Sequence, residues 1–351
     1  MTTSATTSEE NLRHGWRKAL SNEEVHSLLA MRDARSWFTL AFNWGLVGAS
    51  FALVAAWPNP LTVLLAIYLL GGRMLGFAVL MHDASHRALF RNRKVNDWVG
   101  NWLCAYPIWS DLRPYRPYHL QHHGKTGTPE DPDIGLVTPF PITKRSLRRK
   151  MWRDLSGQTG RKFAKAAFRR TFGRFNEDED ARWAAIGVTV TNLALFALLA
   201  ALGHPALYLL WVVAWLTTYT WVTRIRAIAE HALTPDQTDP LRNTRTTIAS
   251  PLERLFIAPN RVNYHLEHHL LMTVPHYNLP RMHEMLRDRG AYDDACIDRG
   301  YAVVLRRAAS KSAAGGTGDT DADDRNDVDP SRLNGLIAPP DAPSGPPSPP
   351  S

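Results

Sequence analysis

Four long apolar runs constrain the fold of this chain more than any other feature of its sequence. Each run is about long enough to cross a bilayer hydrocarbon core of ~30 Å as a helix. Two short connections, Pro58-Asn59-Pro60 and Gly203-His204-Pro205, join the runs in pairs. The sequence therefore predicts an all-α integral membrane protein with two helical hairpins. The four predicted transmembrane spans cover residues 36–57, 61–81, 183–203 and 206–223.

Polar segments flank this apolar part. Residues 1–35 form a polar N-terminal segment, in which Ser21 followed by Glu24 fits a capping box that starts a short helix. Residues 36–308 form the predicted membrane domain. The tail, residues 309–351, is rich in Gly, Ala, Asp, Ser and Pro, and is predicted to be disordered because it cannot bury a core.

The formal net charge is +8, and residues 144–174 are dense in Lys and Arg. Nucleic-acid binding is one interpretation of that segment. A basic segment between two apolar hairpins is more typical of a helix on an anionic cytoplasmic leaflet, so we expect no nucleic-acid partner. The two tight connections contain no Lys or Arg. The positive-inside rule therefore places both termini and the long middle loop in the cytoplasm.

Histidines are concentrated in three clusters, one reading H-x-x-x-H and two reading H-x-x-H-H. Positions i, i+3 and i+4 share one face of a helix, and imidazole is the commonest side-chain ligand of transition metals. All three clusters lie outside the predicted spans, on the predicted cytoplasmic side. The candidate metal ligands are His82, His86, His119, His122, His123, His265, His268 and His269.

Eight histidines are too many for one ion, whereas two ions with four to six ligands each would use them fully. Nitrogen-rich coordination suits iron, copper or zinc, and because copper and zinc generally take three or four ligands, a dinuclear site favours iron. Two irons can supply electrons to O2, and the oxidant formed can attack an unactivated C–H bond. A metal transporter or sensor is the alternative, but transport would place polar ligands within the spans.

The three clusters, with apolar hairpins between them, resemble the membrane fatty acid desaturase superfamily over roughly residues 36–289. That superfamily contains desaturases, hydroxylases and ketolases. The resemblance implies four transmembrane helices under a cytosolic helical cap that holds a non-heme di-iron site. Its relatives carry a further ligand between the fourth span and the last cluster, and His231 occupies that position as a ninth candidate.

The resemblance also implies a reaction and its partners. We expect O2-dependent desaturation of a long-chain fatty acyl lipid taken from the bilayer, with hydroxylation or ketolation of an acyl, alkane or carotenoid chain as the alternative. Electrons would come from a separate donor of the ferredoxin, rubredoxin or cytochrome b5 type, since the chain contains no His-Pro-Gly-Gly haem motif. The later clusters and the loop at residues 128–133 resemble acyl-lipid desaturases most. The first cluster has three intervening residues rather than the four of the animal stearoyl-CoA type, which argues against an acyl-CoA substrate.

Three carboxylates, Asp83, Glu230 and Glu267, neighbour candidate ligands. Each can orient an imidazole as a hydrogen-bond acceptor or pair with a nearby arginine. Arg73, inside the second span, either faces the interior or extends its charge towards water.

Two further segments carry structural expectations. The sequence Arg113-Pro114-Tyr115-Arg116-Pro117 predicts a break in structure before the second cluster, and residues 98–109 predict an interfacial or half-buried helix. The remaining histidines have no partner pattern and are interpreted as ordinary surface or core residues: His14, His26, His204, His276 and His283.

Overall fold

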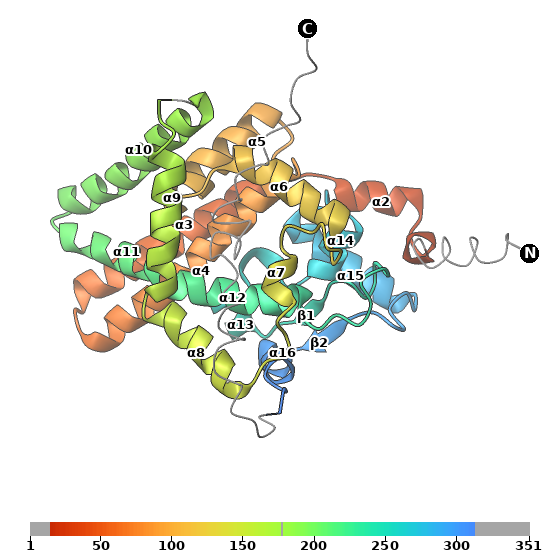
Figure 1. Ribbon diagram of the computed structural model, residues 1–351. Helices are drawn as coiled ribbons and strands as arrows, with labels where there is room; N and C mark the ends of the chain where they lie inside the picture. Colours follow the sequence, from red (N-terminus) through yellow and green to blue (C-terminus); the bar gives the residue numbers. More distant parts are fainter. Residues whose placement is uncertain (1–14, 177, 313–351) are drawn as a thin grey trace, which may run out of the picture.

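The computed structural model describes residues 15–176 and 178–312, which form an almost entirely helical protein (Figure 1). The first fourteen residues and nearly all of the predicted tail lie outside this described part. Within it, four helical segments are long and apolar enough to cross a membrane. They are α3 (Asp33–Ala56), α4 (Pro60–Ser85), α10 (Glu179–Ala201) and Pro205–His231, and the last contains η3 (Pro205–Leu207), α11 (Tyr208–Leu216) and α12 (Thr218–His231). The predicted all-α fold with four spans in two hairpins is confirmed.

The first hairpin turns where the sequence places its Pro-Asn-Pro connection. Asn59 is the N-cap of α4, and its side-chain oxygen accepts hydrogen bonds from the backbone N–H groups of Leu61 and Thr62 at 3.0 and 3.2 Å. Pro60 follows as the first helical residue, where its missing N–H costs no hydrogen bond. Cap and proline together start α4 at a fixed position.

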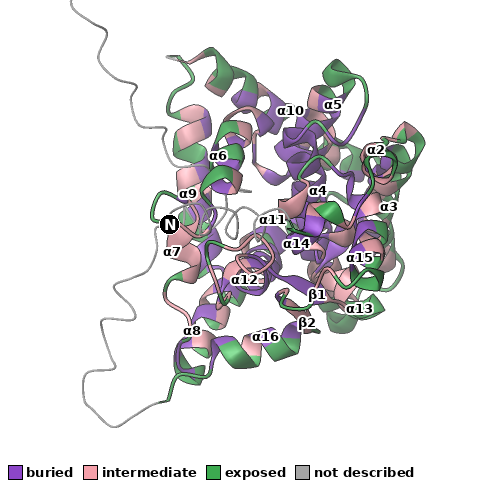
Figure 2. Ribbon diagram, turned by 90° about the vertical axis from the view of Figure 1, so that its right-hand side faces the viewer, coloured by how far each residue is buried: buried purple, intermediate pink, exposed green. Residues whose placement is uncertain are grey.

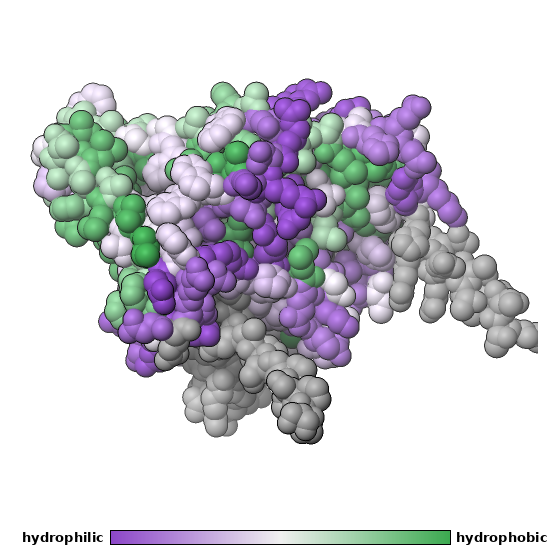
Figure 3. All heavy atoms as spheres, turned by 90° about the horizontal axis from the view of Figure 1, so that it is seen from above, coloured by the Kyte–Doolittle hydropathy of each residue, from purple (hydrophilic) through white to green (hydrophobic). Residues whose placement is uncertain are grey.

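Apolar side chains gather at one end of the molecule. In the view from above they cover the left-hand part, where the turns of both hairpins lie in Figure 1 (Figure 3). Large apolar residues are exposed there, among them Leu61, Leu64, Leu198, Leu202 and Leu209. Contiguous exposed apolar surface marks a membrane or protein contact, and here it belongs to the four candidate spans.

Helix α4 lies at the centre of the fold, packed against α3, α11 and α12. Its second half is buried throughout, from Leu70 to Ser85, and Figure 2 shows buried ribbon in the middle of the molecule. It has 26 residues, so at 1.5 Å per residue it is about 39 Å long, more than the ~30 Å of a bilayer core. Its last turns therefore extend beyond the apolar part and carry His82 and His86 out of it.

The fourth span is helical but not continuous. Thr217 adopts φ −123° and ψ −83° between α11 and α12, and α12 then runs on to His231, eight residues past the predicted end of the span. Helix α9 packs against this break, because a Cβ on Gly160 would lie 2.6 Å from the carbonyl carbon of Leu216. The break sets the direction of α12 and so the position of His231 at its end.

The remaining helices form the polar part and the connections. The capping box predicted at Ser21 is confirmed, because Glu24 N–H donates to the Ser21 hydroxyl and Ser21 N–H to the Glu24 carboxylate.

The helices outside the four candidate spans are α2 (Asn22–Leu29), α5 (Arg93–Val99), α6 (Leu112–Lys125), α7 (Ile134–Val137), α8 (Lys144–Leu155), α9 (Gln158–Phe172), α13 (Pro251–Phe256), α14 (His265–Leu270), α15 (Leu279–Asp288) and α16 (Tyr301–Ala308). Short turns are η1 (Gly100–Ala105), η2 (Tyr106–Ile108), η4 (Pro259–Arg261) and η5 (His276–Asn278).

The prediction of a break at residues 113–117 is wrong. Helix α6 runs from Leu112 through both prolines to Lys125. Pro114 is the third helical residue, where an N–H has no intrahelical acceptor in any case. Only Pro117 removes a hydrogen bond from the helix. Asp111 compensates at the start, since its carboxylate accepts from the Arg113 N–H at 3.0 Å.

Two other segments refine the sequence-based picture. Residues 98–109 are helical, but the helix changes from α to π at Gly100 and to 3-10 at Tyr106, and its second half is largely buried. A two-stranded parallel sheet joins β1 (Thr246–Ile248) to β2 (Ile297–Arg299). A strand of three residues is too short to show an alternation of apolar and polar side chains, so the sequence does not predict either strand.

We predict that Gly71→Val destabilises the protein. A Cβ at Gly71 in α4 would lie 2.8 Å from the Thr218 backbone in α12, so a larger side chain must push two central helices apart. The expected cost is about 1–3 kcal/mol, measurable as a lower unfolding temperature in detergent. Gly45→Val in α3 is the matched control, because a Cβ there meets nothing within 4 Å. Equal unfolding temperatures for the two variants would contradict the prediction.

Candidate metal centre

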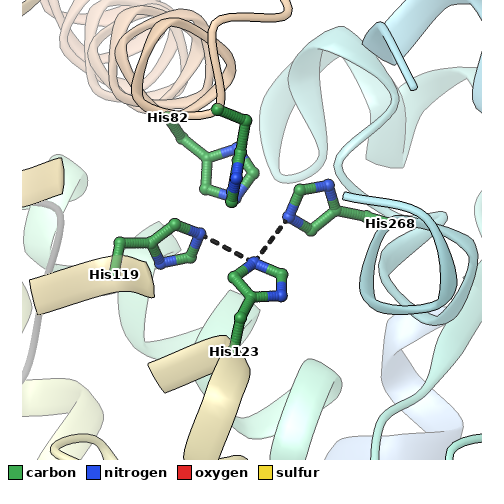
Figure 4. A group of neighbouring side chains, drawn as sticks. His82, His119, His123 and His268 are labelled. Carbon is green, nitrogen blue, oxygen red and sulfur yellow. Dashed lines mark hydrogen bonds between the residues drawn. The ribbon is translucent and has the colours of Figure 1, made fainter. Parts of the chain in front are cut away.

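Nine histidines from four separate elements converge in the polar part of the molecule. They come from the end of α4, from α6, from the end of α12 and from α14. They form two groups, in each of which the ligand atoms lie within 4.8 Å of one another. The first group contains His82, His86, His119, His123 and His268, and the second contains His122, His231, His265 and His269. Figure 4 shows four imidazoles of the first group pointing towards one another.

Helical spacing explains how three clusters serve two groups. His82 and His86 are four residues apart on α4 and both face the first group. On α6, His119 and His123 form another such pair in the first group, while His122 faces the second. On α14 the assignment is reversed, because His265 and His269 belong to the second group and His268 to the first. An H-x-x-H-H sequence thus contributes a pair to one group and one imidazole to the other.

The nitrogen atoms fit a metal ion at each group. His123 Nε2 lies 3.0 Å from both His119 Nε2 and His268 Nε2, and His265 Nε2 lies 2.8 Å from His231 Nε2. A proton on His123 Nε2 can be donated to only one of these two neighbours at a time. The lone pair of at least one neighbouring nitrogen therefore faces His123 Nε2 without a hydrogen bond. Two nitrogens bound at right angles, each about 2.1 Å from one ion, would be about 3.0 Å apart.

Unsatisfied nitrogens give independent support. Within the described residues, His82 Nε2, both ring nitrogens of His86 and His269 Nε2 are buried without any hydrogen-bond partner. A buried polar atom without a partner costs about 1–3 kcal/mol, and such atoms are rare in native structures. A bound cation at each group would satisfy one nitrogen of each of these three imidazoles.

Burial also keeps the imidazoles in the form that binds metals. It lowers the pKa well below the ordinary histidine value for His86, His119, His123, His265, His268 and His269, and neighbouring imidazoles lower it further. Neutral imidazole has a free lone pair, whereas imidazolium has none. These residues are therefore available as ligands at neutral pH.

Two carboxylates orient imidazoles of the centre. Asp131 Oδ1 lies 2.8 Å from His122 Nδ1, which leaves His122 Nε2 for the second group. Asp83 Oδ1 lies 3.4 Å from His82 Nδ1, while its other oxygen lies 2.8 Å from Nδ1 of the buried His276. A hydrogen bond to the distal nitrogen fixes the tautomer and ring direction of a ligating histidine.

The other two candidate carboxylates behave differently. Glu230 pairs with Arg226 at 2.6 Å, and its second oxygen lies 3.6 Å from His265 Nε2. Glu267 is fully buried but turned towards another part of the protein. It accepts hydrogen bonds from Tyr292 and Thr246 and lies 2.6 Å from His283 Nδ1, so it positions α14 rather than a single imidazole.

Sequence reasoning assigned no role to Asp131, His276 or His283. Asp131 follows His122 by nine residues in a loop, and carboxylates in loops are too common to be singled out by spacing. His276 contacts Asp83 across 193 positions of sequence. Only the folded chain reveals such a pairing.

A small cavity of about 40 Å³ borders the second group. His122, His231 and His265 line it, together with Glu230 and Asp133. This volume holds a small molecule such as water. Free space therefore lies beside the second group, and His119 of the first group also lines it.

The fold and the site together define a membrane protein with a histidine-rich site that can hold metal ions. The sequence profile of the family described as Fatty acid desaturase matches residues 56–299. The chain belongs to the fatty acid desaturase family, and it is an oxidoreductase of that type. The matched range includes all nine histidines of the two groups.

Several characterised proteins are similar to this chain. Dihydrorhizobitoxine desaturase of Bradyrhizobium elkanii is 30% identical over 252 residues, which cover 68% of this chain and 70% of that protein. An sn-1 oleoyl-lipid 12-desaturase of Picosynechococcus sp. is 24% identical over 74% of this chain and 79% of its own. Beta-carotene 4-ketolase of Protosiphon botryoides is 34% identical over 86 residues, which are 24% of this chain and 21% of the ketolase.

We predict that the purified protein holds two metal ions per chain and that loss of a ligand in either group lowers this content. His123→Ala, in the first group, and His269→Ala, in the second, should each lower the metal content by one ion or more in elemental analysis, because α6 and α14 each contribute to both groups. His204→Ala is the control, because His204 is exposed in the turn before α11. Full metal content in both group variants would contradict the assignment.

The lowered pKa values predict a pH dependence for the metal-free protein. A folded-state pKa below the ordinary ~6.5 means that the unfolded chain takes up protons first as the pH falls. Stability gained from neutral, buried imidazoles is therefore present above pH ~6.5 and decreases below it. After a chelator has removed the metal, the unfolding temperature should decrease as the pH is lowered from 8 to 5. An equally flat profile with and without metal would contradict this prediction.

Proposed function

We propose that the nine histidines bind two irons and that the protein is an O2-dependent desaturase of a long-chain fatty acyl lipid. The observation that carries the proposal is the pair of buried imidazole groups, each with nitrogens that lack any other partner. Five nitrogens at the first group and four at the second leave coordination positions open on six-coordinate ions. Imidazole ligands with open positions suit iron that reacts with O2.

The reaction converts a –CH2–CH2– unit, O2, two electrons and two protons into a double bond and two molecules of water. The irons, when bound, would supply O2 activation and removal of the two hydrogens. The protein residues provide the geometry: Asp131 and Asp83 hold His122 and His82 in one ring orientation. Burial of six of the nine imidazoles limits the access of bulk water, and the cavity beside the second group admits a small molecule.

The substrate class rests on the family and on the membrane spans. Two kinds of relative point to desaturation, and one of them is named for oleoyl lipid as substrate. Helices α4 and α12 carry His82, His86 and His231 directly from the apolar part to the metal centre. An acyl chain in the bilayer would therefore need to extend only to the ends of these helices.

The proposal includes topology and an electron donor. The turns of both hairpins carry no Lys or Arg, whereas the loop between the hairpins, including α8 and α9, is strongly basic. The positive-inside rule then favours a cytoplasmic location for both termini and the metal centre. Electrons would come from a separate soluble or membrane-bound donor of the ferredoxin, rubredoxin or cytochrome b5 type.

Oxygenation of a hydrocarbon chain is a second candidate function. The similarity to beta-carotene 4-ketolase, although limited to 86 residues, supports it. The same two irons would serve both reactions, because the outcome depends on where the second hydrogen or an oxygen atom goes after the first C–H bond is broken. Substrate placement decides between them.

Lipid analysis distinguishes these functions. We predict that expression in a host with simple lipids, together with an electron donor, yields acyl chains lighter by two hydrogens in mass spectrometry. Acyl chains heavier by one oxygen would instead identify a hydroxylase. His268→Ala should abolish the product, because the first group loses a nitrogen that lies 3.0 Å from His123 Nε2.

The matched control is again His204→Ala, which should retain full activity, and both variants should remain in the membrane fraction. Undiminished product from His268→Ala and from several other group variants would overturn the proposed site. A purified protein without iron would overturn the di-iron assignment even if it were folded.

A further inference from the structure

A second cavity, whose lining contains none of the nine histidines, is rich in positive charge. It encloses about 790 Å³ between the first turns of α3, the α13–η4 segment and the η5–α15 segment. Five guanidinium groups line it, and Glu284 is the one carboxylate among the lining residues. The arginines are Arg35, Arg73, Arg254, Arg261 and Arg281.

Arg73 is a buried cation of this cavity that lacks a counterion among the described residues. It lies in α4, within a candidate span, and is 2% exposed. Its guanidinium donates to Asn43 Oδ1 at 3.1 Å and to the Leu255 carbonyl, and its Nε has no partner. No carboxylate of the described residues pairs with it. A buried charge without a counterion is costly, so an anion in the cavity would stabilise this arrangement.

The backbone beside the cavity is held in a conformation that side chains rarely adopt. Asn260 and Arg261 are consecutive residues with φ of 52° and 65°, and both line the cavity. Asn260 is fixed by a hydrogen bond to the Gly76 carbonyl at 2.8 Å and by one from Asn43 at 3.0 Å. Strain of this kind persists where surrounding structure maintains it, and it is concentrated at functional sites.

One wall of the cavity is apolar and faces outwards. Phe38 and Phe42 lie one turn apart on α3, with exposed fractions of 72% and 49%, and their rings are stacked. Both belong to a candidate span, near its start. The cavity therefore combines guanidinium groups with a hydrocarbon surface at the end of an apolar helix.

The geometry points to a binding site for an anionic phospholipid, with its phosphate among the arginines and an acyl chain along Phe38 and Phe42. Guanidinium groups bind phosphate oxygens in pairs of hydrogen bonds, and basic residues beside a span attract anionic lipids. An acidic protein partner fits less well, because it could not reach Arg73 inside the span. This site contains none of the nine histidines and goes beyond the proposed reaction.

The test measures unfolding temperature in neutral detergent by tryptophan fluorescence, using the metal-loaded full chain. Three soluble ligands are compared: dihexanoyl phosphatidylglycerol, dihexanoyl phosphatidylcholine and glycerol phosphate. We expect phosphatidylglycerol to raise the unfolding temperature by a few degrees, because a ligand that binds only the folded state stabilises it. Phosphatidylcholine and glycerol phosphate should have much smaller effects.

Arg254→Gln combined with Arg281→Gln should abolish most of the shift, since both residues line the cavity but are not fully buried. Arg93→Gln combined with Lys94→Gln removes the same charge from an exposed part of α5 and should leave the shift unchanged. An undiminished shift in the cavity variant, or no shift in the wild type, would overturn the site. Equal shifts from phosphatidylcholine would exclude charge recognition, and equal shifts from glycerol phosphate would exclude a lipid.

Discussion

The convergence of nine imidazoles, six of them buried and three partly buried, is the constraint on which the rest of this structure depends. Uncharged nitrogens with opposed lone pairs repel, and protonation is disfavoured because burial lowers their pKa. Cations at the two groups would resolve the conflict, and the contributing elements meet at one point. Two of them, α4 and α12, come from the apolar hairpins, and two, α6 and α14, come from the polar part.

The membrane-spanning part and the histidine site therefore belong to one domain, because α4 and α12 contribute to both. Helix α4 is long enough to cross the apolar region and still present His82 and His86 beyond it. Helix α12 reaches the same place after the break at Thr217, which lets the span change direction before His231. Close packing at Gly71 keeps these two helices in contact, so the relative positions of their terminal histidines are fixed by backbone contact.

Much of this could be predicted from the sequence because the signals are local. The length of the apolar runs predicted the four spans, and the i, i+3, i+4 spacing predicted eight of the histidines that converge. His231 came from resemblance, since a single histidine has no spacing signal of its own. The helix through Pro117 was missed because the proline pattern outweighed the helical periodicity, whereas the structure shows that an N-cap and tertiary packing retain the helix. The pairing of Asp83 with His276, and the arginine cavity, depend on contacts between distant segments that no local pattern encodes.

The way in which α6 and α14 divide their histidines has a consequence for assembly. Each helix supplies a pair to one group and a single imidazole to the other, so an ion at either group fixes the rotation of both helices. Much of the ordering entropy of the second group is then lost when the first ion binds, and the next ion binds at a smaller entropic cost. Thermodynamic linkage makes this effect mutual. Loading would accordingly be cooperative, with chains holding two ions or none more abundant than chains holding one.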